Sequence, residues 1–261
     1  MAGPRRPAHP EETVIDARRP AGPRHENAVL ALLRIPVLRR MWAAITVSSL
    51  GDWLGLLANT ALAQQLTSDR SVAAQGVAIS GVILTRLLPD VLLGPIAGAL
   101  ADRLDRRRTI IIGDVLAGLL FLSIALFYDL TWLYVAQFFI EAVGLFTMPA
   151  KQAVWVNIVP REKLPVANQM SLISVYGAVP VAAVIFALLS TANRVVQDPL
   201  LGSERIPIVA ALGLNALSFF AAAATVYASR HEIPSFLAGG GDTTHVFAAI
   251  REGVVFIRRS A

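Results

Sequence analysis

Apolar residues along the chain form six long runs, each separated from the next by a short polar or charged segment. The runs cover residues 41–66, 74–101, 109–128, 132–156, 166–192 and 206–228. Each has about the 20-residue length that a helix needs to cross the hydrocarbon core of a bilayer. The runs are too long and alternate too little to be barrel strands, and backbone groups in lipid must pair within one segment. The pattern therefore predicts six transmembrane helices.

Composition supports an all-α integral membrane protein. Hydrophobic residues make up 55% of the chain and charged residues only 16%, whereas a soluble domain carries about 25% charged residues. The net charge of +5 does not indicate nucleic-acid binding, because the basic residues lie at the ends of the apolar runs, where lipid headgroups explain them better. With no cysteine, phosphate loop or metal-ligand spacing, we expect no enzyme activity, no metal and no cofactor.

The flanks of the six runs differ from the runs themselves. Residues 1–40 are predicted to be a cytoplasmic tail rich in Pro and Arg that ends in an interfacial helix over residues 29–40. Residues 41–229 form the transmembrane bundle. Residues 230–261 are predicted to be a cytoplasmic loop, in which apolar residues at helical spacing over 245–259 indicate an amphipathic helix on the membrane surface.

The distribution of basic residues predicts the orientation. Of the 23 Lys and Arg residues, nineteen fall on one side of the predicted bundle, three fall on the other side, and Arg86 lies within a run. Because short cytoplasmic loops collect Lys and Arg, the richer side is cytoplasmic. We therefore expect a multi-pass protein of the plasma (inner) membrane with both termini in the cytoplasm.

Four charged residues lie deep within the predicted spans, where an unpaired charge costs at least ~3 kcal/mol. Asp52 and Arg86 lie at similar depths, so we expect them to pair, with Asp90 one turn along as a second partner of Arg86. Glu141 has no evident basic partner, which favours a group that gains and loses a proton during transport. The alternative is that all four only hold the helices together. Asp114 is expected to pair locally with the basic residues 106–108.

A charged motif joins the second and third runs. It begins Gly98-Ala-Leu-Ala-Asp102-Arg103 and continues Leu-Asp105-Arg106-Arg107. The spacing resembles the helix 2–3 signature of the major facilitator superfamily of membrane transporters, except that Asp105 stands where glycine is usual. Asp is one of the few other residues that tolerate a left-handed turn. The resemblance implies a cytoplasmic latch that breaks and reforms during transport; the alternative is that these arginines only set the topology.

Further motifs narrow the resemblance. Gly51-Asp52-Trp53, Thr85-Arg86 and Pro149-Ala150-Lys-Gln152-Ala153 look like the exporter branch that contains macrolide-efflux and siderophore-export proteins. Pro180 stands in the fifth run, where proton antiporters of the superfamily carry a Gly-Pro pattern, but the neighbouring glycines are missing. Pro180 can still kink that helix.

The resemblance implies a six-helix N-terminal half of a twelve-helix exporter, built as two inverted three-helix repeats. Such a protein would use the proton gradient to export a small hydrophobic or siderophore-like molecule by alternating access. The expected partners are the lipid bilayer, the substrate, and a second six-helix half or a second copy of the chain. A truncated product is the favoured explanation of the length. A six-helix subunit of an ATP-driven transporter and a non-transporting membrane scaffold remain alternatives.

Overall fold

The structure is a computed structural model of the 261-residue chain, and it describes residues 25–101, 104–196 and 205–232. Within these residues all regular structure is helical. The elements are α1 His25–Leu33, α2 Pro36–Gln65, α3 Val72–Ala101, α4 Arg106–Phe127, α5 Leu130–Ile158, the short 3₁₀ helix η1 Arg161–Lys163, α6 Leu164–Val196 and α7 Arg205–Ala228. The six helices α2 to α7 are long and apolar enough to cross a membrane. The prediction of an all-α protein with six transmembrane helices is confirmed.

Local signals in the sequence explain where the helices begin and end. Pro36 stands in the first turn of α2, where a missing N–H is no loss. Asp129 accepts a hydrogen bond from the Trp132 amide at 2.8 Å and so caps the start of α5. Tyr128 ends α4 in the left-handed conformation, with φ of 51°. Only two residues, Tyr128 and Asp129, therefore separate α4 from α5.

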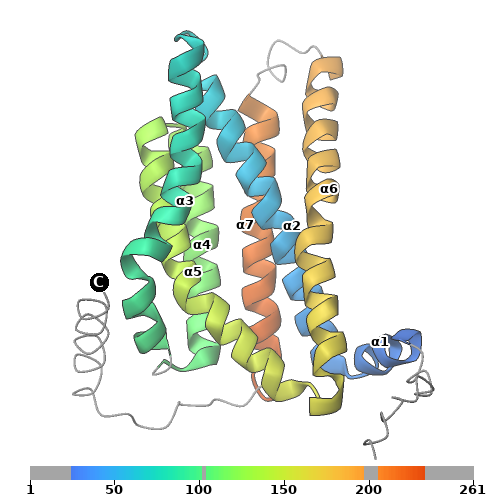
Figure 1. Ribbon diagram of the computed structural model, residues 1–261. Helices are drawn as coiled ribbons and strands as arrows, with labels where there is room; N and C mark the ends of the chain where they lie inside the picture. The colour runs from blue at the N-terminus through green and yellow to red at the C-terminus, as the bar shows by residue number, and fades with distance from the viewer. Residues whose placement is uncertain (1–24, 102–103, 197–204, 233–261) are drawn as a thin grey trace, which may run out of the picture.

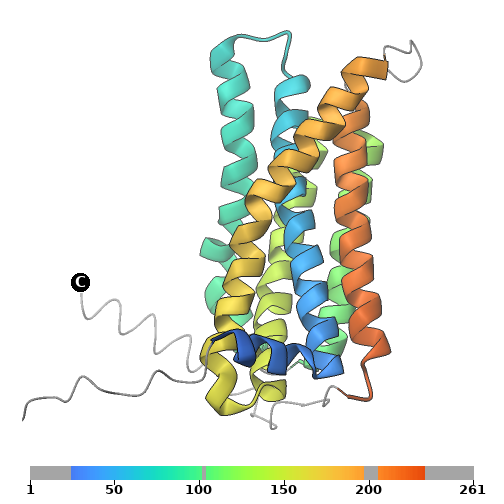
Figure 2. The same ribbon diagram turned by 90° about the vertical axis from the view of Figure 1, so that its right-hand side faces the viewer.

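The first helix differs from its prediction. A single interfacial helix was expected over residues 29–40, but α1 ends at Leu33 and α2 begins at Pro36. Arg39 and Arg40 therefore belong to the first turns of α2. Pro36 is the reason for the break, because its ring fixes φ and it cannot donate to the carbonyl one turn earlier. Figure 2 shows α1 lying across the end of the bundle at which α2 begins.

The packing of the helices shows two related halves. α2 packs most extensively against α7 and α6, and α5 packs in the same way against α4 and α3. If α2 is matched with α5, α3 with α6 and α4 with α7, the contacts of α2 correspond to the contacts of α5. Each helix reverses the direction of the one before it, so the two sets run in opposite directions (Figure 1). This is the arrangement expected of two inverted three-helix repeats.

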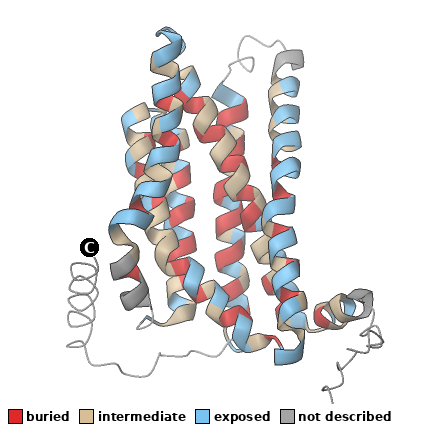
Figure 3. Ribbon diagram, in the orientation of Figure 1, coloured by how far each residue is buried: buried red, intermediate tan, exposed pale blue. Residues whose placement is uncertain are grey.

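Burial is unequal among the helices. In the most apolar stretch of α7, 56% of residues are buried within the chain, but in α3 and α6 the share is only 17%. Figure 3 shows exposed residues along most of the length of α3 and α6. Lipid can cover such apolar faces, and so can another helical unit. The packed interior of the chain lies instead among α2, α4, α5 and α7.

Glycine allows two of these helix pairs to approach closely. A Cβ atom placed on Gly51 of α2 would overlap Asn215 and Ser218 of α7. A Cβ atom on Gly113 of α4 would overlap Thr147 of α5. Small residues at such crossings let the backbones pack directly, which is a common device in membrane helix bundles. The contact at Gly113 holds α4 and α5 close together near the charged residues described below.

Two predicted segments lie outside the described residues: the Pro- and Arg-rich tail before α1 and the amphipathic helix over residues 245–259. Pro180 lies inside α6, which continues through it. Pro149 lies in the C-terminal part of α5, where the helix bends away from the axis of the bundle (Figure 1).

Candidate functional site

A cavity of about 150 Å³ lies among five of the membrane-spanning helices, α2, α3, α4, α5 and α7. Its walls carry five charged side chains: Asp52, Arg86, Asp114, Glu141 and Lys151. Apolar side chains complete the lining, among them Phe121 of α4 and Phe219 of α7. A cluster of charges surrounded by apolar residues at membrane depth is the expected form of an ion or substrate site.

Arg86 and Glu141 form one of the two ion pairs in this cavity. The Arg86 Nε lies 3.3 Å from the Glu141 Oε1, and both side chains remain partly exposed. The prediction that Arg86 pairs with Asp52 is wrong, as is the prediction that Glu141 lacks a basic partner. The reason is tertiary: α3, which carries Arg86, packs far more extensively against α5 than against α2.

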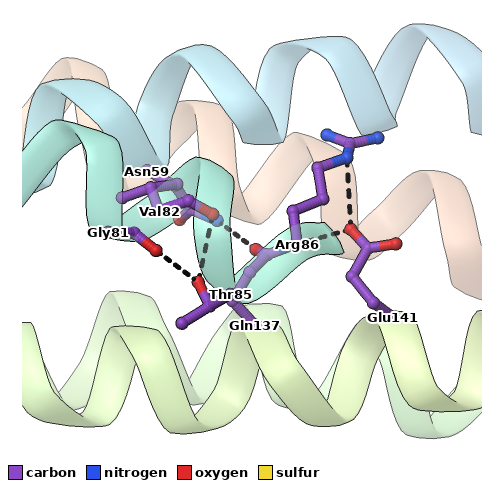
Figure 4. A network of polar contacts seen from close by, with 7 residues as sticks. All are labelled: Asn59, Gly81, Val82, Thr85, Arg86, Gln137 and Glu141. Atoms are coloured by element: carbon purple, nitrogen blue, oxygen red, sulfur yellow. Dashed lines mark hydrogen bonds and ion pairs between the residues drawn. The ribbon is translucent and has the colours of Figure 1, made fainter. Parts of the chain in front are cut away.

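A chain of hydrogen bonds extends the Arg86–Glu141 pair across the bundle (Figure 4). Gln137 donates to the Glu141 Oε1 at 2.7 Å, and Asn59 of α2 donates to the Gln137 Oε1 at 2.7 Å. The Arg86 guanidinium also lies 6.0 Å from the centre of the Trp53 ring. Three helices thus hold Glu141 in one position, and a proton on this carboxylate would weaken both the ion pair and the hydrogen bond from Gln137.

Asp114 and Lys151 form the second ion pair. The Lys151 Nζ lies 2.8 Å from the Asp114 Oδ1, and the Asp114 side chain is only 1% exposed. The expected local pairing of Asp114 with the basic residues 106–108 is wrong, because Asp114 faces the interior of the bundle and Lys151 reaches it from α5. Lys151 was counted with the basic residues of the cytoplasmic side, and it lies instead inside a membrane helix.

The two remaining candidates make no ion pair. In the part of the chain that the structure describes, the ion pairs are Arg40–Glu232, Arg86–Glu141 and Lys151–Asp114. Asp52 lines the cavity without belonging to any of them. Asp90 lies one turn from Arg86 on α3 but is exposed and does not line the cavity. The structure therefore does not support Asp90 as a second partner of Arg86.

The predicted latch is only partly within the described residues. Gly98 belongs to the last turns of α3, whereas Asp102 and Arg103 lie outside the described part. Arg106 begins α4, and the Arg107 guanidinium donates to the Arg230 carbonyl, just beyond α7, at 2.6 Å. The latch itself therefore remains a prediction.

Asp105 does not adopt the left-handed turn that was expected at the glycine position of the motif. Its φ is −62° and its ψ is 109°. Its carboxylate accepts a hydrogen bond from the Arg108 amide at 3.0 Å and so caps the start of α4. An N-cap requires an extended residue with a short acceptor side chain. Asp105 therefore stands at the glycine position of the motif as the N-cap of α4 and not as a left-handed turn residue.

Three residues of the site were missed in the sequence: Lys151, Gln137 and Asn59. Gln137 could have been found, because it stands one helical turn before Glu141 and such pairs face each other. Lys151 is the single basic residue within the run 132–156, which is itself a signal of an intramembrane partner. The aromatic residues Phe138, Phe139 and Phe146 of α5 do not line the cavity. Within the described residues, no group of three or more His, Cys, Asp or Glu side chains could hold a metal ion.

A bundle of six apolar helices around a charged internal cavity is typical of membrane transport proteins. Residues 41–257 match the family model of the Major Facilitator Superfamily. The chain belongs to this superfamily of transporters, as its motif predicted. The match does not favour a subunit of an ATP-driven transporter or a non-transporting scaffold.

One curated relative is the uncharacterized MFS-type transporter YfiS of Bacillus subtilis (strain 168). The chain is 28% identical to it over 228 residues, which cover 85% of this chain and 49% of that protein. The chain thus spans about half the length of the curated relative it matches. No solved structure matches the chain.

Proposed function

We infer that the chain is the N-terminal six-helix half of a proton-coupled exporter for a small, largely apolar molecule. The observation that carries this proposal is the Arg86–Glu141 ion pair in a cavity at membrane depth. Such a pair is stable only while Glu141 is charged. Protonation of Glu141 would release Arg86 and the Gln137 amide together. Binding of a proton would therefore change the contacts among the helices.

The second half of the cleft would come from another six-helix unit. The share of the YfiS sequence that the chain covers supports this proposal, and so do the apolar faces that α3 and α6 leave exposed. The unit could be further residues of the same polypeptide, a separate chain or a second copy. In each case the cavity would widen into a site between two halves that rock about it. We place the protein in the plasma (inner) membrane with both termini in the cytoplasm, following its basic residues.

The substrate side of the proposal rests on the exporter-branch motifs at Asp52, Arg86 and Pro149 and on the apolar part of the cavity lining. A small hydrophobic or siderophore-like molecule fits these features. The latch formed by Gly98, Asp102, Arg103, Asp105, Arg106 and Arg107 would hold the cytoplasmic side closed in one state.

The test is an assay in everted vesicles that contain the protein together with its second six-helix unit. Substrate addition should dissipate an imposed pH gradient, a protonophore should abolish transport, and depletion of ATP should not. Glu141→Gln should abolish the proton flux, whereas the matched control Asp69→Asn, at an exposed carboxylate between α2 and α3 and outside the cavity, should not. Full proton-driven transport by Glu141→Gln with unchanged pH dependence would overturn the proposal.

A further inference from the structure

The cavity holds an unequal number of positive and negative groups, and this points to its ligand. We propose that the cavity binds the ammonium group of an organic cation, with Asp52 as the counter-ion. This inference rests on the proposed export function and names its substrate class.

The first argument is the charge balance. The lining carries three carboxylates, Asp52, Asp114 and Glu141, but only two basic groups, Arg86 and Lys151. Each basic group is already paired, at 3.3 Å with Glu141 and at 2.8 Å with Asp114. Asp52 is left without an ion pair at membrane depth, where an uncompensated charge is costly. One positive charge, brought by a ligand, balances the cavity.

The second argument is the kind of polar atom that the lining leaves unpartnered. The Asp114 Oδ2 is buried and has no hydrogen-bond donor within reach, and its side chain is only 1% exposed. It is a carboxylate oxygen, so it attracts a cationic ligand and repels an anionic one. Of the two ligand types considered for the exporter, the charge and the free acceptor favour a hydrophobic amine over an acidic siderophore-like molecule.

The third argument is the aromatic surface of the cavity. Phe121 and Phe219 both line it, with their ring centres 5.7 Å apart. The Lys151 ammonium already lies 5.9 Å from the centre of the Phe219 ring. Aromatic faces attract ammonium groups, most strongly where water is excluded. The volume of about 150 Å³ suits a small cationic head rather than a whole large ligand.

A proton competes with the ligand for Asp52. The charged groups that face Asp52 are Arg86 from α3, Asp114 from α4, and Glu141 and Lys151 from α5. Neither α6 nor α7 contributes a charged residue to the described lining. Cation binding should therefore weaken as pH falls, and this dependence should require Asp52.

The test measures binding to the purified 261-residue chain in lipid nanodiscs by equilibrium dialysis. The probes are phenyltrimethylammonium, which is permanently charged, and tert-butylbenzene, which has the same shape and no charge. We expect the cation to bind at least about tenfold more tightly than the neutral probe. Asp52→Asn should lower the affinity for the cation at least about tenfold and remove its pH dependence, while the affinity for tert-butylbenzene should stay within about twofold.

Two further variants separate charge from misfolding. Asp52→Glu keeps the carboxylate and should retain most of the binding. The double variant Arg40→Gln with Glu232→Gln removes one charge of each sign from an exposed ion pair outside the cavity, so it should change the affinity for the cation by no more than about twofold. Equal binding of the two probes, absence of cation binding, or full cation binding by Asp52→Asn would overturn the inference. Proton-coupled flux without a preference for cations would reject this inference alone, whereas cation binding without any flux would reject only the proposed export function.

Discussion

Lys151 of α5 donates a hydrogen bond of 2.8 Å to Asp114 of α4, and this ion pair lies between two cavities. One is the charged cavity described above. The other has a volume of only about 10 Å³ and lies among the first turns of α2 and the last turns of α7, next to Met41 and Val226. Both cavities are lined by Asp114 and Lys151. The pair therefore links α4 to α5 and also separates the two cavities inside the six-helix unit.

Loss of one partner of this ion pair should be strongly and unequally destabilising. Lys151→Met leaves Asp114 buried and unpaired, so we expect a loss of about 3–5 kcal/mol in the free energy of unfolding. Asp114→Asn should cost less, because Asp52 lines the same cavity and can balance the charge of Lys151. Unfolding in mixed lipid and SDS micelles measures both. The double variant Asp114→Leu with Lys151→Met should recover most of the loss. If the double variant lost as much free energy of unfolding as the two single variants added together, the buried ion pair would be contradicted.

The contact between α2 and α7 should be sensitive to a single methyl group. Gly51→Ala places a Cβ atom against Asn215 and Ser218, and relief of the overlap should cost about 1–3 kcal/mol. Gly213→Ala on α7 is the matched control, because no atom lies close to its added Cβ. The control should be neutral or stabilising by up to about 1 kcal/mol, since alanine is the better helix former. The same unfolding assay compares them, and equal effects at the two positions would argue against the close crossing.

The N-cap of α4 predicts how the motif tolerates substitution. Asp105→Ala removes the acceptor for the Arg108 amide and should cost about 1 kcal/mol of stability, whereas Asp105→Ser should retain most of it. Asp105→Gly, which restores the usual residue of the motif, should cost only a few tenths of a kcal/mol. Thermal unfolding of the purified variants would check this order. A clear gain in stability with glycine would mean that the position requires a left-handed backbone.

The orientation of the bundle can be tested directly, because the chain has no cysteine. Asp69 lies exposed between α2 and α3, and Glu162 lies exposed between α5 and α6, at the opposite end of the bundle. A membrane-impermeant maleimide should label Asp69→Cys in intact cells and label Glu162→Cys only after the membrane is opened. The reverse pattern would place the termini outside and would contradict the orientation drawn from the basic residues.

The helices were predictable because each one is decided by nearby residues. All six predicted spans begin within five residues of the observed helices. The two largest differences are at α2 and α4, which start earlier because their first turns carry arginines that a hydropathy pattern leaves out. The break at Pro36 was missed, although proline is a strong local signal.

The pairing of charges could not be predicted in the same way. Depth along a helix places Asp52, Arg86 and Glu141 at comparable levels, but the partner of Arg86 depends on which helix lies beside α3. Asp114 likewise has nearby arginines in the chain and yet pairs with Lys151, which lies 37 positions further on.

Hydropathy and charge along the chain were thus enough to establish the membrane class, the six spans and the family, because lipid requires long apolar helices and the latch motif is local. The packing of the helices alone decided which charges meet, which glycines lie at crossings and which carboxylate is left unpaired. Side-chain ion pairs act over a few ångströms, so they depend on the lateral and rotational placement of whole helices. That placement results from many contacts spread over the chain, and no single motif records it.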